Sequence, residues 1–294
     1  MTLSGVYVPL VTPFDAAGAV AYAAIELLAH QVLDGGAAGL VALGTTGEPG
    51  ALDAEEQRDV VDVIARVCRE RGAPLLVAAN SVAALAALGD RPEVTAALTL
   101  VPPFVRPGEA GVVAHLAALA AASPVPLVVY HVPYRTGQPL SAATRRRIAA
   151  LPGIAGVKLA VGGIDDTTVD LLADPPARFA VLGGDDTVIS PMLALGAHGG
   201  ILASAHLTTA AFVDLVDGWR AGDAGPARVL GHRLAALSAA LFAAPNPTVL
   251  KAILHAQGRI PSPAVRLPLL APGDDAVRAA LARLAAAPVE AAHP

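Results

Sequence analysis

Short apolar runs recur along the chain, and most of them continue without alternating with polar residues. The eight runs are residues 5–12, 39–43, 75–79, 97–101, 127–130, 154–158, 179–182 and 200–203. Continuous apolar strands are typical of a parallel sheet whose two faces are both covered. We therefore predict one buried strand in each run.

The segments between these runs carry apolar residues at helical spacing, as in residues 54–71 and 111–122. A strand followed by a helix, repeated eight times, predicts an α/β protein with a (β/α)8 TIM barrel. An open, doubly wound sheet is the alternative fold. Its dinucleotide-binding version is disfavoured because no G-x-G-x-x-G follows the first strand.

The strand pattern ends near Gly222. Residues 224–244, 248–257 and 275–287 then show helical spacing, with proline-rich breaks between them. No flexible Gly/Ser linker precedes these segments, so we expect little structural independence. The predicted organisation is a catalytic TIM barrel in residues 1–222 and a C-terminal helical extension in residues 223–294.

Composition excludes several classes of protein. With 54% hydrophobic and 15% charged residues, the chain is expected to fold compactly, and its net charge of −5 argues against nucleic-acid binding. The apolar runs end before the roughly 18 residues of a membrane span, and no signal-type N-terminus is seen, so we expect a cytoplasmic protein without membrane contact. The basic cluster at residues 145–147 is expected on a solvated helix face.

Cysteine and histidine usage disfavours a metal site. Cys68 is the single cysteine, which excludes an intrachain disulfide and a cysteine-based zinc site, and its helical context predicts a core position. The eight histidines show no H-E-x-x-H spacing. We therefore predict no bound metal, and His198 and His206 are expected to be structural.

Lys158 is unusual because it ends the apolar run 154–158. A lysine that reaches solvent is the ordinary explanation, since lysines are rarely fully buried. However, the carboxyl ends of the strands form the active site of a TIM barrel. Burial there disfavours an ammonium, and a neutral amine condenses with a ketone or aldehyde to give a Schiff base.

Two other strand ends carry polar residues that would meet Lys158 in one pocket. The second strand runs into Gly44, Thr45 and Thr46, whose amides and hydroxyls suit a carboxylate, although a turn with threonine caps is an equal alternative. Beyond the fifth strand come Tyr130, His131 and Arg135. These groups predict a site for a small organic acid.

Seven motifs resemble one enzyme family in order and spacing: GTTGEPGAL, YHVPYRTG, GVKLAVGG, GDD, GGIL, PNPTVLK and RLPL. The chain resembles, over nearly its whole length, the dihydrodipicolinate synthase and N-acetylneuraminate lyase family of pyruvate-dependent class I aldolases. The resemblance implies a TIM barrel with a C-terminal helical domain. It also implies a homo-oligomer, either a dimer or a tetramer built from two tight dimers.

The resemblance also implies roles for individual residues. Lys158 would form the imine with pyruvate or another 2-oxo acid, without a further cofactor, and Tyr130 would relay protons. Thr45 would link the relay, Thr46 would bind the carboxylate of the 2-oxo acid, and Arg135 would bind a second carboxylate.

Three further positions follow from the resemblance. The backbone carbonyl of Ile201 would lie beside the pyruvyl group, and Gly44 would open the substrate-binding turn. His131 stands where the lyase branch often has histidine, so contact with the substrate and a structural hydrogen bond are both open. Glu48 is expected to brace the threonine turn, and the aspartates of the GDD motif to cap a helix.

Departures from the family pattern leave the second substrate open. The synthase branch places a tyrosine, which reaches into the partner subunit, where this chain has Phe104, and residues 159–163 lack the usual hydroxyl. One alternative is therefore an aldolase or dehydratase for a 2-keto-3-deoxy sugar acid or an aromatic 2-oxo acid. Another is a non-catalytic paralogue that binds small acids.

Overall fold

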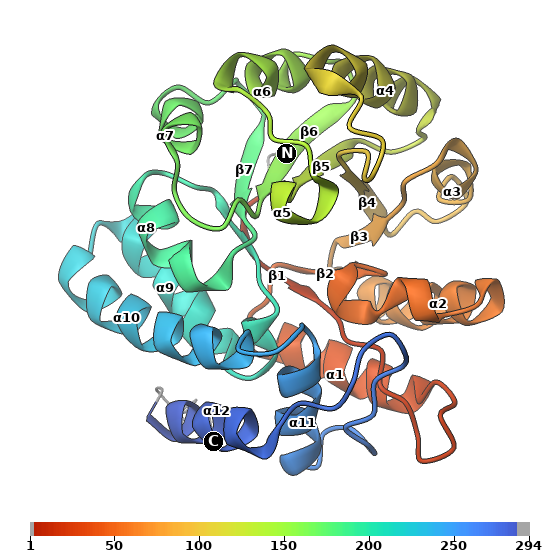
Figure 1. Ribbon diagram of the computed structural model, residues 1–294, viewed down its shortest axis with the longest axis vertical. Helices are drawn as coiled ribbons and strands as arrows, with labels where there is room; N and C mark the ends of the chain where they lie inside the picture. Colours follow the sequence, from red (N-terminus) through yellow and green to blue (C-terminus); the bar gives the residue numbers. More distant parts are fainter. Residues whose placement is uncertain (1–2, 287–294) are drawn as a thin grey trace.

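The computed structural model describes residues 3–286 and shows eight parallel strands closed into a barrel (Figure 1). The strands are β1 (Gly5–Pro9), β2 (Gly39–Ala42), β3 (Leu75–Ala78), β4 (Val94–Leu100), β5 (Leu127–His131), β6 (Ile154–Leu159), β7 (Ala180–Gly183) and β8 (Gly199–Ile201). Each strand pairs with the next along the chain, and β8 pairs with β1. The predicted TIM barrel is confirmed, and every predicted run overlaps one strand.

Alternate side chains of the strands fill two separate apolar layers. The inner layer includes Val128 and Tyr130 of β5, Leu182 of β7 and Ile201 of β8. The neighbouring residues on the same strands point outward into the larger layer beneath the helices. A residue's place in a strand therefore decides whether it lies inside the barrel or under the helical coat.

The barrel closes where β1 and β8 meet, and glycine makes that contact possible. Gly5 is paired with Gly199 in the parallel register. A Cβ atom added at Gly199 would lie 2.0 Å from the Gly5 carbonyl oxygen, and the φ of Gly199 is +152°. A side chain at Gly199 would thus push the first and last strands apart.

Helices surround the barrel and follow most of its strands. They are α1 (Tyr22–Asp34), α2 (Ala54–Arg71), α3 (Val82–Ala86), α4 (Gly108–Ala122), α5 (Pro133–Thr136), α6 (Ala142–Ala149), α7 (Asp166–Ala173), α8 (Ile189–Ala194) and α9 (Thr209–Ala221). The bounds of α2 have a local cause, because Asp53 and Glu56 form a capping box and Gly72 ends the helix in the left-handed conformation.

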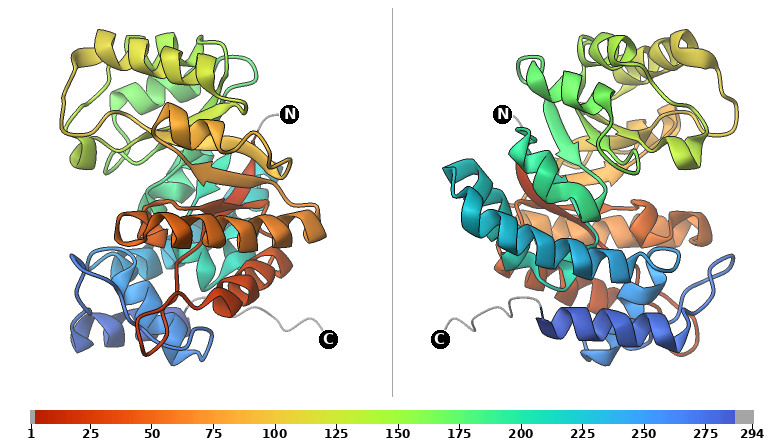
Figure 2. Two further views of the ribbon diagram at one scale, coloured as in Figure 1. Left: turned by 90° about the vertical axis from the view of Figure 1, so that its right-hand side faces the viewer. Right: turned by 60° about the vertical axis from the view of Figure 1, so that its left-hand side comes forward.

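Three more helices follow the barrel: α10 (Ala224–Leu241), α11 (Thr248–Ala256) and α12 (Asp274–Ala286). Helix α10 packs on α8 and α9, and α12 packs on α10 and α11. Figure 2 shows α11 and α12 at one end of the molecule, with α10 running above α12. Residue 287, the predicted end of the last helix, lies outside the described residues. Within residues 3–286, no helix is both long enough and apolar enough to cross a membrane.

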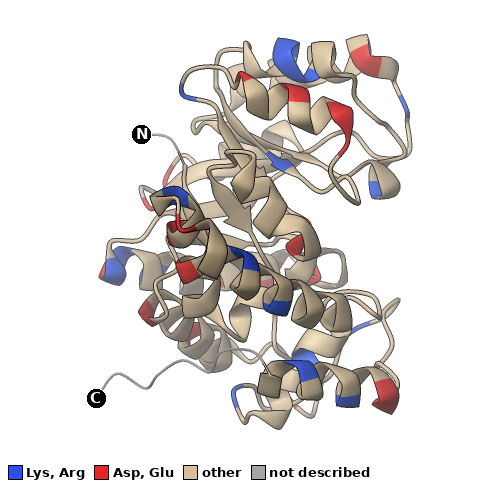
Figure 3. Ribbon diagram, turned by 90° about the vertical axis from the view of Figure 1, so that its left-hand side faces the viewer, with Lys and Arg blue, Asp and Glu red and all other residues tan. Residues whose placement is uncertain are grey.

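Acidic and basic residues are interspersed along the helices that face the viewer in Figure 3. The prediction that residues 145–147 all lie on a solvated face was wrong for Arg145, whose side chain is 5% exposed. Its guanidinium donates hydrogen bonds to Thr168 Oγ1 at 3.2 Å and Asp165 Oδ2 at 3.3 Å. Helix α6 packs against α7 and β6, and Arg145 lies on the face of α6 that makes these contacts.

Candidate active site

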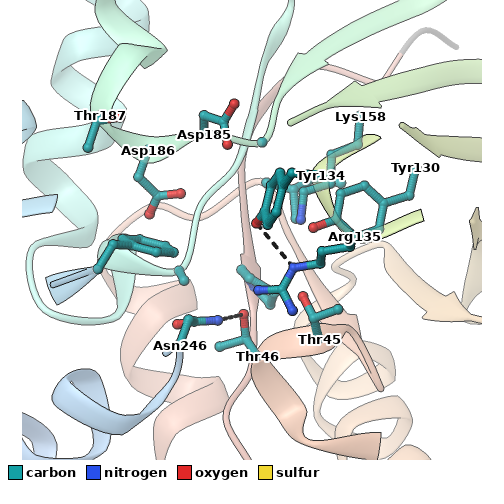
Figure 4. A pocket seen from close by; sticks show the side chains of 15 residues that line it. Thr45, Thr46, Tyr130, Tyr134, Arg135, Lys158, Asp185, Asp186, Thr187 and Asn246 are labelled. Atoms are coloured by element: carbon teal, nitrogen blue, oxygen red, sulfur yellow. Dashed lines mark hydrogen bonds between the residues drawn. The ribbon is translucent and has the colours of Figure 1, made fainter. Parts of the chain in front are cut away.

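A pocket of about 200 Å³ opens at the carboxyl ends of the strands. It is lined by Pro9, Thr45, Thr46, Tyr130, Tyr134, Arg135, Lys158, Gly184, Asp185, Asp186, Thr187, Ile201, Ala203, Phe242 and Asn246. Figure 4 shows side chains from the barrel loops and the C-terminal segment converging on this space. Six of the eight residues predicted for the site lie here, namely Lys158, Tyr130, Thr45, Thr46, Arg135 and Ile201.

Tyr130 and Lys158 occupy directly paired positions on β5 and β6. Paired residues of parallel strands point to the same face, so both side chains enter the barrel mouth. The Lys158 amine lies 4.3 Å from the centroid of the Tyr130 ring, and the two residues are 5% and 6% exposed. The barrel thus holds an amine against a phenol with little solvent access.

Gly184 leaves the room that the Lys158 side chain needs. A Cβ atom at this position would lie 2.7 Å from Lys158 Cε and 2.9 Å from Lys158 Cγ. The Gly184 amide donates to the Leu159 carbonyl at 2.7 Å, which ties the turn after β7 to the end of β6. The absence of a side chain at residue 184 therefore leaves space for the Lys158 side chain beside the turn after β7.

The two threonines lie in the 3₁₀ turn η1 (Thr45–Gly47), which follows β2. The Thr46 hydroxyl accepts a hydrogen bond from Asn246 Nδ2 at 3.0 Å, and the Thr12 hydroxyl donates to the Gly47 carbonyl at 2.7 Å. Gly44 directly precedes the turn in extended conformation and is not among the lining residues. The turn is therefore held by the segment that follows β1 and by the C-terminal segment.

Glu48 ends this turn in the left-handed conformation, with φ of 53°. The predicted contacts with the threonine turn were wrong for its carboxylate, which binds elsewhere. One oxygen accepts from Lys251 Nζ at 2.7 Å, and the other accepts from the Arg266 amide at 3.0 Å. The sequence did not reveal this because both partners lie more than 200 residues away.

Arg135 and Tyr134 come from the short helix α5 beyond β5. Arg135 Nε donates to the Tyr134 hydroxyl at 3.1 Å, and the guanidinium lies 5.3 Å from the centroid of the same ring. Tyr134 itself is 66% exposed. The guanidinium is thereby held at the pocket, where it is suited to bind a carboxylate.

Asp185 and Asp186 were expected to cap a helix, and that prediction was wrong. No side-chain cap bond is formed at η3 (Asp186–Val188). Asp185 instead accepts from the Gly162 amide at 2.7 Å, and Asp186 accepts from the Ser204 amide at 2.6 Å. Burial raises the pKa of Asp186 to about 6 and also raises the pKa of Asp185. The two carboxyls therefore tie neighbouring strand-end loops together.

The structure does not bring His131 to the pocket, which corrects its prediction as a substrate-binding residue. Side chains alternate along β5, so His131 points outward when Tyr130 points inward. It lines a separate cavity of about 10 Å³ with Arg145, and it is 1% exposed. Burial lowers the pKa of His131 to about 4.

Nine of the fifteen lining residues were not predicted as part of the site: Pro9, Tyr134, Gly184, Asp185, Asp186, Thr187, Ala203, Phe242 and Asn246. Phe242 and Asn246 come from the segment between α10 and α11. The proline-flanked Asn246 was the available signal, because a Pro-Asn-Pro break marks a fixed loop. Among residues 3–286, no group of three or more His, Cys, Asp or Glu side chains is placed to hold a metal ion.

The sequence matches the model of the dihydrodipicolinate synthetase family over residues 2–287. The chain belongs to this family. It is 36% identical to the 4-hydroxy-tetrahydrodipicolinate synthase of Moorella thermoacetica, with 89% of this chain and 90% of the relative covered. It is 34% identical to the enzyme of that name from Neisseria meningitidis serogroup B, with 95% of this chain and 98% of the relative covered.

Solved structures of the family agree with the fold. A chloride-inhibited dihydrodipicolinate synthase from Acinetobacter baumannii, complexed with pyruvate, aligns with a TM-score of 0.90 at 32% identity and covers 97% of this chain and 99% of its own. The Thermotoga maritima synthase gives 0.91 at 26% identity with the same coverage. A monomeric synthase variant gives 0.90 at 25% identity and covers 96% of both chains.

Proposed function

We propose that the protein forms an imine between Lys158 and pyruvate or a related 2-oxo acid. We further propose that it makes or breaks a carbon–carbon bond between this acid and an aldehyde. The observation that carries the proposal is the Lys158 amine, which is buried 4.3 Å from the centroid of the Tyr130 ring. A positioned amine beside a phenol suits a reaction that needs a nucleophile and a proton relay.

The neutral Lys158 amine attacks the C2 carbonyl carbon of the acid, whose oxygen takes up a proton. The resulting carbinolamine loses its hydroxyl as water and becomes an iminium. Loss of a proton from C3 gives an enamine, which attacks the aldehyde carbon while the aldehyde oxygen is protonated. Water then hydrolyses the new iminium and frees Lys158. In this proposal Tyr130 gives and accepts these protons, because its phenol lies beside the amine.

The polar groups around the amine account for substrate binding in this proposal. The Thr46 hydroxyl and the amides of the threonine turn receive the carboxylate of the 2-oxo acid, beside Ile201, and Thr45 links the proton relay of Tyr130. The Arg135 guanidinium receives a second carboxylate, carried by the aldehyde. The names of the relatives favour 4-hydroxy-tetrahydrodipicolinate synthase as the activity. In this proposal the imine with Lys158 does the chemistry without a cofactor.

A second candidate is an aldolase for another aldehyde, and Phe104 favours it. This residue has no hydroxyl, so it cannot supply the proton-relay group that the synthase branch has at this position. It is 93% exposed in the single chain and is not among the residues that line the pocket.

The loop that carries Phe104 also exposes a second apolar side chain, because Val105 beside it is 75% exposed. Large exposed apolar side chains mark interaction surfaces, so we propose that this loop meets a second copy in a homo-oligomer in the cytoplasm.

Trapping with borohydride tests the proposal, because the chain contains only two lysines, Lys158 and Lys251. Pyruvate with borohydride should add one reduced adduct by intact mass, and peptide mapping should place it on Lys158. The Lys158→Ala variant should remain unlabelled, although it keeps Lys251 and the N-terminal amine. An adduct that persists in this variant would contradict the assignment. A panel of aldehydes then identifies the second substrate.

A further inference from the structure

The chain carries 20 lysines and arginines, of which 18 are arginine and two are lysine. One lysine lies in the pocket, and the proposed function gives no role to the other. Lys251 lies in α11, its side chain is fully buried, and it does not line the pocket. A buried cation of this kind requires a physical reason.

Three groups surround the Lys251 amine. It donates to Glu48 Oε1 at 2.7 Å and to the Thr12 carbonyl at 2.8 Å, and it lies 4.1 Å from the centroid of the Phe14 ring. The Glu48 side chain is 2% exposed. Burial lowers the pKa of Lys251, and the Glu48 carboxylate offsets part of this effect. Lys251 and Glu48 therefore form a buried ion pair with a short hydrogen bond, and losing either partner would leave the other charge buried without compensation.

Glu48 transmits this contact to the threonine turn. It holds a left-handed backbone conformation, which is strained for a residue with a side chain and persists where the surroundings enforce it. Its amide donates to the Thr45 carbonyl at 3.3 Å. Lys251 and the Arg266 amide hold the two carboxylate oxygens, so Glu48 is fixed from both sides.

A second contact reaches the same turn from the same part of the chain. Asn246, just before α11, donates to the Thr46 hydroxyl at 3.0 Å. The Thr12 residue whose carbonyl receives Lys251 also donates its hydroxyl to Gly47. The turn that carries both threonines is therefore attached to α11 and to the end of β1 at several points.

We propose that Lys251 is a positioning residue: through Glu48 it fixes the turn that presents Thr45 and Thr46 to the carboxylate of the 2-oxo acid. This inference rests on the proposed function. It makes the C-terminal helical segment part of the substrate-binding apparatus, although Lys251 does not itself touch the substrate. The effect of losing it should thus appear in substrate affinity more than in the chemistry at Lys158.

The test measures how labelling of Lys158 by pyruvate and borohydride depends on pyruvate concentration. Lys251→Met keeps most of the side-chain volume and removes the ammonium. We expect the half-saturating pyruvate concentration to rise by about 10-fold or more, because small displacements of binding groups have effects of this size. Labelling at saturating pyruvate should still reach the level set by the folded fraction.

Arg145→Met is the matched control, because Arg145 is also a buried cation paired with a carboxylate and lies in α6, away from the pocket. Its half-saturating concentration should equal that of the wild type even if its thermal stability falls. If Lys251→Met behaves like this control, with lower stability and unchanged half-saturation, the positioning role is overturned.

Glu48→Gln provides a second variant if Lys251→Met does not fold, because glutamine keeps the shape and one acceptor oxygen. We expect a rise in half-saturation of about 3-fold or more, smaller because one hydrogen bond survives. An unchanged value in a folded Glu48→Gln protein overturns the inference. Absence of labelling in the wild type instead overturns the proposed function, so the two failures are distinguishable.

Discussion

The two lysines of the chain are both buried, but their amines have different neighbours and therefore different expected reactivity. Lys251 is held by a carboxylate and a carbonyl, both of which favour its charged form. Lys158 faces a phenol ring at the pocket and has no carboxylate within salt-bridge distance among residues 3–286. An amine without such a partner is free to react with a carbonyl compound, whereas a paired one is not.

His131 should make stability depend on pH. Burial lowers its pKa from 6.5 to about 4, so the unfolded chain binds a proton that the native chain does not between these values. The free energy of unfolding should therefore fall as pH decreases from 6.5 towards 4, by about 3 kcal/mol from this residue. Above pH 6.5 His131 is neutral in both the native and the unfolded chain, so it costs no stability there.

Urea unfolding of His131→Leu measures this effect. Between about pH 7 and pH 4.5 the variant should lose about 2 kcal/mol less stability than the wild type. His206, whose pKa burial also lowers to about 4, is present in both proteins, so its contribution cancels. Equal losses in the two proteins would show that His131 does not titrate in this way.

At the scale of elements, apolar runs located all eight strands because a strand covered on both faces leaves a continuous signal. The start of β4 was missed: it begins at Val94, three residues before the predicted run. Thr95 there is exposed and interrupts the run. Helix α2 has the bounds that the helical spacing of its apolar residues predicted, and in the structure Asp53 and Gly72 set these two ends.

The site could be predicted from the fold itself only for residues whose meeting the strand order dictates; Thr45, Thr46 and Arg135 were predicted from motifs. Tyr130 and Lys158 end neighbouring strands, so their meeting follows from the barrel itself. The approach of Asn246 and the pairing of Glu48 with Lys251 depend on how α11 packs against the barrel, and no local pattern encodes that packing. His131 was misassigned because a motif match does not reveal the face to which a strand residue points.

The turn after β7 gives a prediction at this scale. In Gly184→Ala, the new methyl group would meet Lys158 Cε at 2.7 Å, so we expect the lysine to move while the fold persists. The initial rate of imine trapping should fall by about 10-fold or more, with a nearly unchanged melting temperature. Gly163→Ala is the control, since a Cβ there meets nothing within 4 Å. Equal trapping rates in the two variants would refute the steric argument.

For the whole molecule, we propose that the helical extension, described over residues 223–286, unfolds together with the barrel, described over residues 3–222. Helix α10 covers α8 and α9, and α11 supplies Lys251 to the turn after β2. Contacts of this kind, spread over both parts, favour a single cooperative transition. The extension is then a structural component of the barrel rather than a second folding unit.

The lone cysteine tests this cooperativity from the far side of the barrel. Cys68 lies buried in α2, and burial raises the pKa of its thiol to about 12, so a thiol reagent should label it only after unfolding. Leu237→Ala in α10 removes a fully buried side chain and should destabilise the protein by about 2–5 kcal/mol. The urea midpoint for Cys68 labelling should fall with that for circular dichroism. A Cys68 midpoint that stays at the wild-type value would show independent unfolding.

The long separation between Glu48 and Lys251 also matters while the protein is being made. The two residues are 203 positions apart, so at about 5–20 residues per second a ribosome delivers Lys251 roughly 10–40 s after Glu48. During that interval the nascent chain already carries Tyr130, and later Lys158, but the carboxylate of Glu48 has no ammonium to hold it. In the proposed function, the polypeptide therefore contains the imine-forming amine of Lys158 before Glu48 and its turn are held, and full affinity for the 2-oxo acid is expected only once Lys251 has been added.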